Sequence, residues 1–95
     1  MVFVWDEDKN RINRRKHGIS FEAAIRIFED PHAVSYVDRV IDNEERWHTV
    51  GLAGGVALVL VVHTAGEEDD GEETFRIISA RKASSSERSL YETSE

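Results

Sequence analysis

Residues 56–64 read VALVLVVHT and contain the longest apolar segment of the chain. Val56 to Val62 is apolar at odd and even positions alike, the pattern of a central strand covered on both faces. The run is too short to span a bilayer. Gly54-Gly55, immediately before it, predicts a tight turn. We therefore expect a strand in the middle of a sheet, entered through a hairpin.

Weaker strand patterns flank this segment. Strands are predicted at residues 33–37, 46–52 and 74–81, which together with 56–64 give an antiparallel meander of three or four strands. A short strand at 2–5 opens the chain. The 95 residues show no internal repeat and no linker, so one domain is expected.

Two helices are predicted between the first strand and the meander. Asp6 suits the N-cap of the first, which ends near His17 because Gly18 accepts the left-handed conformation. The second begins after Ser20 and ends at Asp30-Pro31. Its apolar residues follow the i, i+3, i+4, i+7 spacing of a buried face: Phe21, Ala24, Ile25 and Phe28.

A last helix is predicted from the capping box of Ser84 and Glu87 to about Tyr91. The predicted fold class is α+β, with the element order β-α-α-β-β-β-α. The first helix differs from the others because Ile12 is its only strongly apolar residue. It is therefore expected at the surface, with a narrow contact stripe and a wide basic face.

Charge is strongly segregated along the chain. Residues 9–17 contain five cations and no acid, whereas six of the seven residues 67–73 are acidic. Without those six acids the net charge of −7 would be −1. Such segregation indicates a basic binding surface, although both segments also suit a solvated surface. The acidic loop at 65–73 is expected to be mobile.

Several classes of site find no support in the sequence. No cysteine is available for a disulfide or a thiolate metal site, and the four histidines show no ligand spacing. No glycine-rich phosphate loop or G-x-S-x-G motif occurs. Acid–base chemistry without a metal or cofactor, or binding alone, remains. No signal peptide is recognised, so a cytoplasmic location is expected.

Three places could carry chemistry. Lys16-His17 ends the basic helix, where cations complement the helix dipole and could equally bind phosphate and exchange a proton. Arg76 and Arg81 lie on one predicted strand and should point to opposite faces if that strand is regular. One of them could pair with Glu45 or a helix acid while the other grips phosphate. His63 suits a satisfied structural role or proton exchange.

Motifs across nearly the whole chain resemble the BrnT toxin family, also called the domain of unknown function 497 family. Its N-terminal signature is matched by FVWD at 3–6, Lys9, Asn13, KHGISFEA at 16–23 and FEDP at 28–31. The match continues through ER at 45–46, Gly51 and VVHT at 61–64. Its C-terminal signature is matched by RIISARKA at 76–83, ER at 87–88 and Tyr91.

The resemblance implies a RelE-like fold in which two N-terminal helices pack on a small antiparallel sheet. It implies a metal-independent ribonuclease toxin that blocks translation, neutralised by a BrnA-type antitoxin with a ribbon-helix-helix part. DNA would be contacted only through the antitoxin. As a hypothesis, the catalytic residues are Lys16, His17, His63, Arg76 and Arg81, and the RNA-binding residues are Arg14, Arg15, Arg46 and Lys82.

Two other functions remain in view. The chain could be a non-catalytic RelE-like module that only binds an antitoxin and supports operon autorepression. Direct DNA binding is a weaker hypothesis, because no helix-turn-helix pattern is recognised and the net charge opposes it. The acidic loop is long for the family, and within roughly 10 Å of the site its charge would repel RNA.

Overall fold

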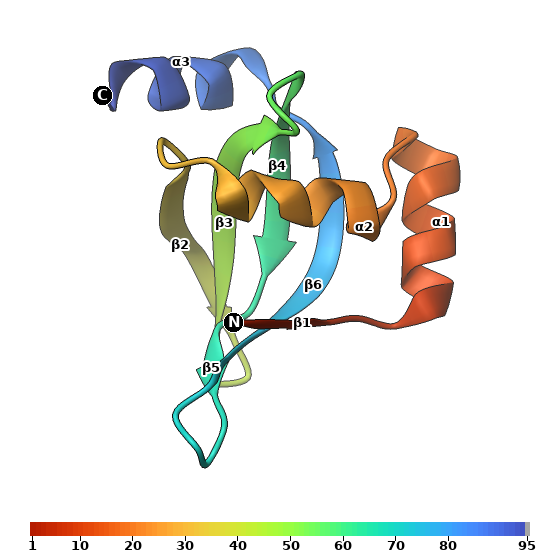
Figure 1. The fold of residues 1–95 in the computed structure, drawn as a ribbon, viewed down its shortest axis with the longest axis vertical. Coiled ribbons are helices and arrows are strands. Elements are labelled where there is room, and N and C mark those ends of the chain that lie inside the picture. Colours follow the sequence, from red (N-terminus) through yellow and green to blue (C-terminus); the bar gives the residue numbers. More distant parts are fainter. Residues whose placement is uncertain (95) are drawn as a thin grey trace.

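The computed structural model describes residues 1–94, and a β-sheet runs through its centre (Figure 1). The strands are β1 (Val2–Val4), β2 (Val34–Ile41), β3 (Glu44–Ala53), β4 (Ala57–His63), β5 (Gly66–Glu67) and β6 (Glu73–Lys82). The helical elements are α1 (Glu7–His17), α2 (Phe21–Ala24), the 3-10 helix η1 (Ile25–Glu29) and α3 (Ser85–Thr93). Across the sheet the order is β1-β6-β4-β3-β2, and β5 pairs with β6 beside this path. The α+β class is therefore confirmed.

The meander of β2, β3, β4 and β6 is antiparallel, as the strand patterns predict. However, β1 pairs with β6 in parallel, with Phe3 opposite Phe75, so the sheet is mixed and the prediction of a wholly antiparallel sheet is wrong. A parallel pair joins distant segments, and no turn motif announces it. β2 also runs well beyond the predicted end at residue 37. Asp42 and Asn43, with φ of 51° and 64°, supply the two left-handed residues of the turn into β3.

The second predicted helix is only partly α-helical. α2 has four residues, and the chain then tightens into the five residues of η1. Accordingly the fully buried side chains, Phe21, Ala24 and Ile27, recur every three residues, as in a 3-10 helix. Ile25 and Phe28, which the α-helical spacing predicts to be buried, are half-buried against the same cluster. The N-terminal side thus has one full α-helix, not two.

The first helix attaches to the sheet through asparagines. Its predicted caps are confirmed, because Asp6 accepts hydrogen bonds from the first turn and Gly18 has a φ of 73°. Ile12 is 56% exposed, whereas Asn10 and Asn13 are buried. The Asn13 amide donates to the carbonyl of Ala80 at 2.8 Å and accepts from its N–H at 3.1 Å. β1 pairs with β6 only as far as Arg76. Farther along the same edge of β6, the Asn13 side chain takes the place of a neighbouring strand by bonding the backbone of Ala80.

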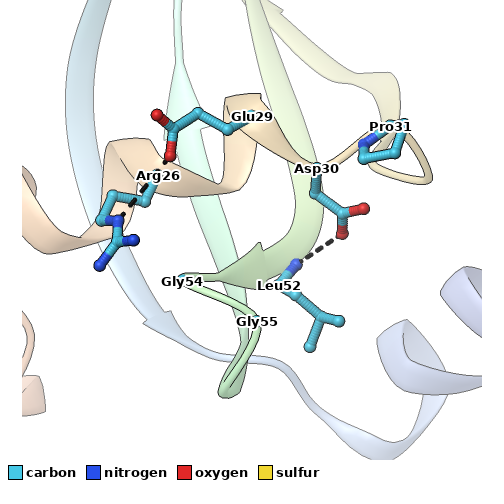
Figure 2. A pocket seen from close by; sticks show the side chains of 7 residues that line it. All are labelled: Arg26, Glu29, Asp30, Pro31, Leu52, Gly54 and Gly55. Carbon is cyan, nitrogen blue, oxygen red and sulfur yellow. Dashed lines mark hydrogen bonds and ion pairs between the residues drawn. The ribbon is translucent and has the colours of Figure 1, made fainter.

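Asp30, which ends η1, joins three elements. Its carboxylate accepts from the Leu52 N–H of β3 at 2.8 Å (Figure 2) and from the Tyr91 hydroxyl of α3 at 2.7 Å. Burial alone would raise the pKa of Asp30, but these bonds and one from the His32 N–H outweigh it and lower that pKa. A groove of about 320 Å³ lies beside it, against the Gly54-Gly55 turn (Figure 2). The carboxylate of Asp30 thus ties η1 to both β3 and α3.

Candidate functional site

The sheet has one face that its helices cover only in part. α2 and η1 cross the first face and pack on Val59, Val61, Ile77 and Ala80 (Figure 1). On the opposite face Tyr91 of α3 packs on Val50, Leu58 and Leu60. Strand alternation also places polar side chains on this second face beyond that cluster. We use the name open face for six of them: Tyr36, Arg46, His48, Arg76, Ser79 and Arg81.

A β-bulge brings Arg76 and Arg81 to the same face. Val62 is opposite Ser79, but the next residue of β4, His63, is opposite Ile77, so β6 has one extra residue at this point. Five positions apart on a regular strand, the two arginines would point in opposite directions. The extra residue reverses the alternation. Opposite orientations were predicted only for a regular strand, and β6 does not meet that condition.

Each arginine of the open face lies beside a carboxylate of the same chain. Arg76 Nη2 is 2.6 Å from Glu44 Oε1, and Arg46 Nε is 3.7 Å from the same oxygen. Arg46 Nε is buried and makes no hydrogen bond. The side chain of Arg76 remains 42% exposed. The partner in this strand region is Glu44, not the predicted Glu45. A guanidinium has five N–H donors, so a further anion can be bound.

Arg81 is held in a two-pronged pair with Glu87 of α3, with both N–H···O distances at 2.8 Å. This contact matches the expectation that one of the two arginines pairs with a helix acid. The hydrogen bonds from Arg81 lower the pKa of Glu87 to about 2. Burial acts in the opposite direction, and the hydrogen bond from the Ser84 N–H lowers this pKa further. The same pairing raises the pKa of Arg81. α3 and the open face are thus joined by a strong charge-assisted contact.

This contact should make stability depend on acid pH. Glu87 has a folded-state pKa of about 2 against an ordinary value of 4.5, so its contribution is complete above about pH 4.5 and is lost as the pH falls toward 2. We expect wild type to be more stable than Glu87→Gln near pH 6, with the difference vanishing near pH 2. Denaturant unfolding of both proteins across this range measures it. A difference that does not change with pH would contradict the assignment.

Tyr36 and His48 form a pair on the open face that no sequence motif indicates. They are directly opposite on β2 and β3, and Tyr36 Oη lies 3.2 Å from His48 Nδ1. The other ring nitrogen, Nε2, lies 3.5 Å from Asp38 Oδ2. Burial, followed by the charges of Glu87 and Asp38, raises the pKa of Tyr36, while Arg81 opposes this. Only the strand register reveals the pair, since twelve positions separate the two residues.

A second basic region borders the open face at the β6 edge. Lys16 and His17 of α1 line a groove of about 200 Å³ together with Ile78 and Ser79 of β6. Ser79 also ends the cross-strand row Tyr36, His48, Val62, Ser79. At about 4.8 Å per strand, this row spans roughly 14 Å. The groove and the open face are therefore neighbours.

The remaining predicted residues lie elsewhere. Arg14 and Arg15 are exposed on α1. Lys82 is opposite Val59, so it belongs to the α2 side of the sheet and not to the open face. His63 is 2% exposed and also faces the α2 side.

The His63 ring is satisfied within the core. Its Nε2 lies 2.7 Å from Thr49 Oγ1 and its Nδ1 lies 3.0 Å from the carbonyl of Thr64. The ring also packs against Phe28 and Phe75. Burial lowers the pKa of His63, which favours the neutral ring. These contacts give it a structural role.

The acidic segment forms a hairpin that includes β5. It extends from the end of the sheet away from α3 (Figure 1), and the N-terminal amine lies 2.6 Å from Glu72. Among residues 1–94, no group of three His, Asp or Glu side chains could hold a metal ion. Within the same part of the chain, no helix has the length and apolar character to cross a membrane.

Comparisons with known proteins agree with this architecture. Residues 5–87 match the model of a family described as the ribonuclease toxin, BrnT, of type II toxin-antitoxin systems. The crystal structure of the Brucella abortus ribonuclease toxin, BrnT, is similar in fold, with a TM-score of 0.55. That likeness covers 88% of this chain and 99% of the other at 24% identity. No curated protein matches the sequence.

Proposed function

The chain belongs to the BrnT family of ribonuclease toxins of type II toxin-antitoxin systems, and we propose that it is itself an active endoribonuclease that cleaves RNA without a metal and inhibits translation. The observation that carries this proposal is the gathering of Arg46, Arg76 and Arg81 on one partly covered sheet face. Guanidinium groups bind phosphate oxygens in pairs, and fixed cations stabilise the charge that develops on a phosphorane.

The roles follow from position. Arg76 and Arg81 would stabilise the phosphorane, with Lys16 at the neighbouring groove, while Arg46, Arg14 and Arg15 would hold the RNA backbone. The α2-side position of Lys82 favours a contact with RNA outside the cleavage site. Of the two histidines predicted to exchange a proton, His17 lies at the groove and His63 is buried. We therefore propose His17 as the group that protonates the leaving oxygen.

The acidic hairpin bears on one end of the proposed site only. It extends from the end of the sheet opposite α3 and is therefore remote from Arg81, which is bonded to α3, whereas Arg76 is three residues from Glu73 on β6. At an ionic strength near 0.1 M, charges more than about 10 Å apart are largely screened. The hairpin is expected to be mobile, and its charge suits contact with a basic antitoxin segment.

We further propose a ribbon-helix-helix antitoxin of the BrnA type as the partner, and a RelE-like arrangement of the single domain. DNA would be reached through that antitoxin. The alternative remains a non-catalytic module that binds the antitoxin and supports operon repression. In such a module the ion pairs of Arg76 with Glu44 and of Arg81 with Glu87 would serve only to stabilise the fold.

Purified, antitoxin-free protein should cleave RNA in the presence of a chelator. Attack by the ribose 2′-hydroxyl predicts 2′,3′-cyclic phosphate and 5′-hydroxyl ends, which end-labelling identifies. The control is the same protein saturated with its antitoxin, which should protect the RNA. Intact RNA after incubation with folded protein that still binds the antitoxin would support the non-catalytic module instead.

A further inference from the structure

We propose that Tyr36 and His48 are the proton-accepting pair of the cleavage reaction, an inference that rests on the ribonuclease activity proposed above. Both side chains lie on the open face with Arg76 and Arg81. Tyr36 and Arg81 also interact electrostatically. The cleavage site therefore has a titratable pair on the β2–β3 side and His17 on the α1 side.

The direction of proton transfer follows from Asp38. A carboxylate only accepts hydrogen bonds, so the Asp38 oxygen that lies 3.5 Å from His48 Nε2, and that also accepts from Arg39 Nε at 2.8 Å, favours the tautomer with the proton on Nε2. His48 Nδ1 then accepts from the Tyr36 hydroxyl at 3.2 Å. This arrangement makes the pair a base and not a proton donor in its resting state.

The step can be written with all protons placed. The ribose 2′-hydroxyl gives its proton to Tyr36 Oη, and Tyr36 passes its own proton to His48 Nδ1. The 2′ oxygen bonds to phosphorus, the bond from phosphorus to the 5′ oxygen breaks, and the 5′ oxygen takes a proton from His17. Solvent then carries the proton from His48 back to His17. Base and acid are needed on opposite sides of the phosphate, so the phosphate would lie within the row of roughly 14 Å between Tyr36 on β2 and Ser79 on β6, with its 2′ oxygen toward Tyr36 and its 5′ oxygen toward α1.

Two single variants and their double variant test the pair. Tyr36→Phe and His48→Gln are each expected to lower the cleavage rate about 100-fold or more, the usual contribution of a general base. The double variant should be no slower than the worse single, because the two groups act as a unit. His32→Gln is the matched control, because His32 is exposed in the turn before β2 and should cleave as wild type does.

A sulfur substrate separates base from acid. The phosphodiester that wild type cleaves fastest is resynthesised with sulfur in place of the 5′ oxygen, since a thiolate leaves without protonation. His17→Gln should recover on this substrate, whereas Tyr36→Phe and His48→Gln should remain slow. Wild-type cleavage rates in both folded pair variants would overturn the inference, as would their recovery on the sulfur substrate. If wild type itself leaves RNA intact, the proposed function fails and not merely the choice of base.

Discussion

Replacing Asn13 by alanine is expected to destabilise the protein by about 3–5 kcal/mol, because several buried polar groups lose their partner at once. The Asn13 amide bonds the N–H and the carbonyl of Ala80 and the carbonyl of Ile19. Each buried group left unpaired costs about 1–3 kcal/mol. A domain of this size is stable by only roughly 5–14 kcal/mol. Denaturant unfolding followed by tryptophan fluorescence measures the loss.

Ile12→Ala is the control for this prediction. Ile12 precedes Asn13 on α1 and is the helix's one large apolar residue, yet it is 56% exposed. Its replacement should change stability by no more than about 0.5 kcal/mol, as is usual at the surface. Equal losses in the two variants would mean that α1 does not depend on the asparagine contact.

Arg76→Ala and Arg81→Ala are each expected to lower the rate of RNA cleavage about 100- to 1,000-fold, the effect typical of removing one fixed donor from a transition-state site. Expression of either variant should also relieve growth arrest. The Arg76 pair with Glu44 is half-exposed, so its loss should cost no more than about 1 kcal/mol of stability. Cleavage assays and unfolding curves on the same preparations separate the two effects.

Arg26→Ala is the matched control. Arg26 lies on η1 at the other face of the sheet and has an exposed partner, Glu29, at 3.8 Å, so the same type of ion pair is removed away from the site. It should cleave RNA as wild type does. Normal cleavage by folded Arg76→Ala and Arg81→Ala would remove the open face from the proposed function.

Arg81 needs one more comparison, because its loss leaves the Glu87 carboxylate without its cation. The double variant Arg81→Ala with Glu87→Gln removes both charges, and Ser84 still caps α3 through its side chain. If the cleavage defect reflects lost phosphate binding, it should persist in this double variant. Recovery of cleavage would assign the single-variant defect to a disturbed α3.

The candidate site was only partly predictable from the sequence. The arginines of the site, Arg46, Arg76 and Arg81, could be named from motifs, but their common face could not. His63 ends the central strand and was a candidate for proton exchange, yet its ring is buried against Phe28 and Phe75. Tyr36 and His48 belong to no motif, and their proximity depends on the pairing of β2 with β3.

Local chemistry by itself determined the ends of α1, the capping box of α3, the antiparallel meander and the segregation of charge, because each depends on a few neighbouring residues. Tertiary structure alone decided the parallel pairing of β1, the asparagine contact across 67 positions and the bulge in β6. The physical reason is that register and bulges are settled by packing between strands far apart in sequence. One extra residue in β6 placed on one face two arginines that a regular strand would point to opposite sides.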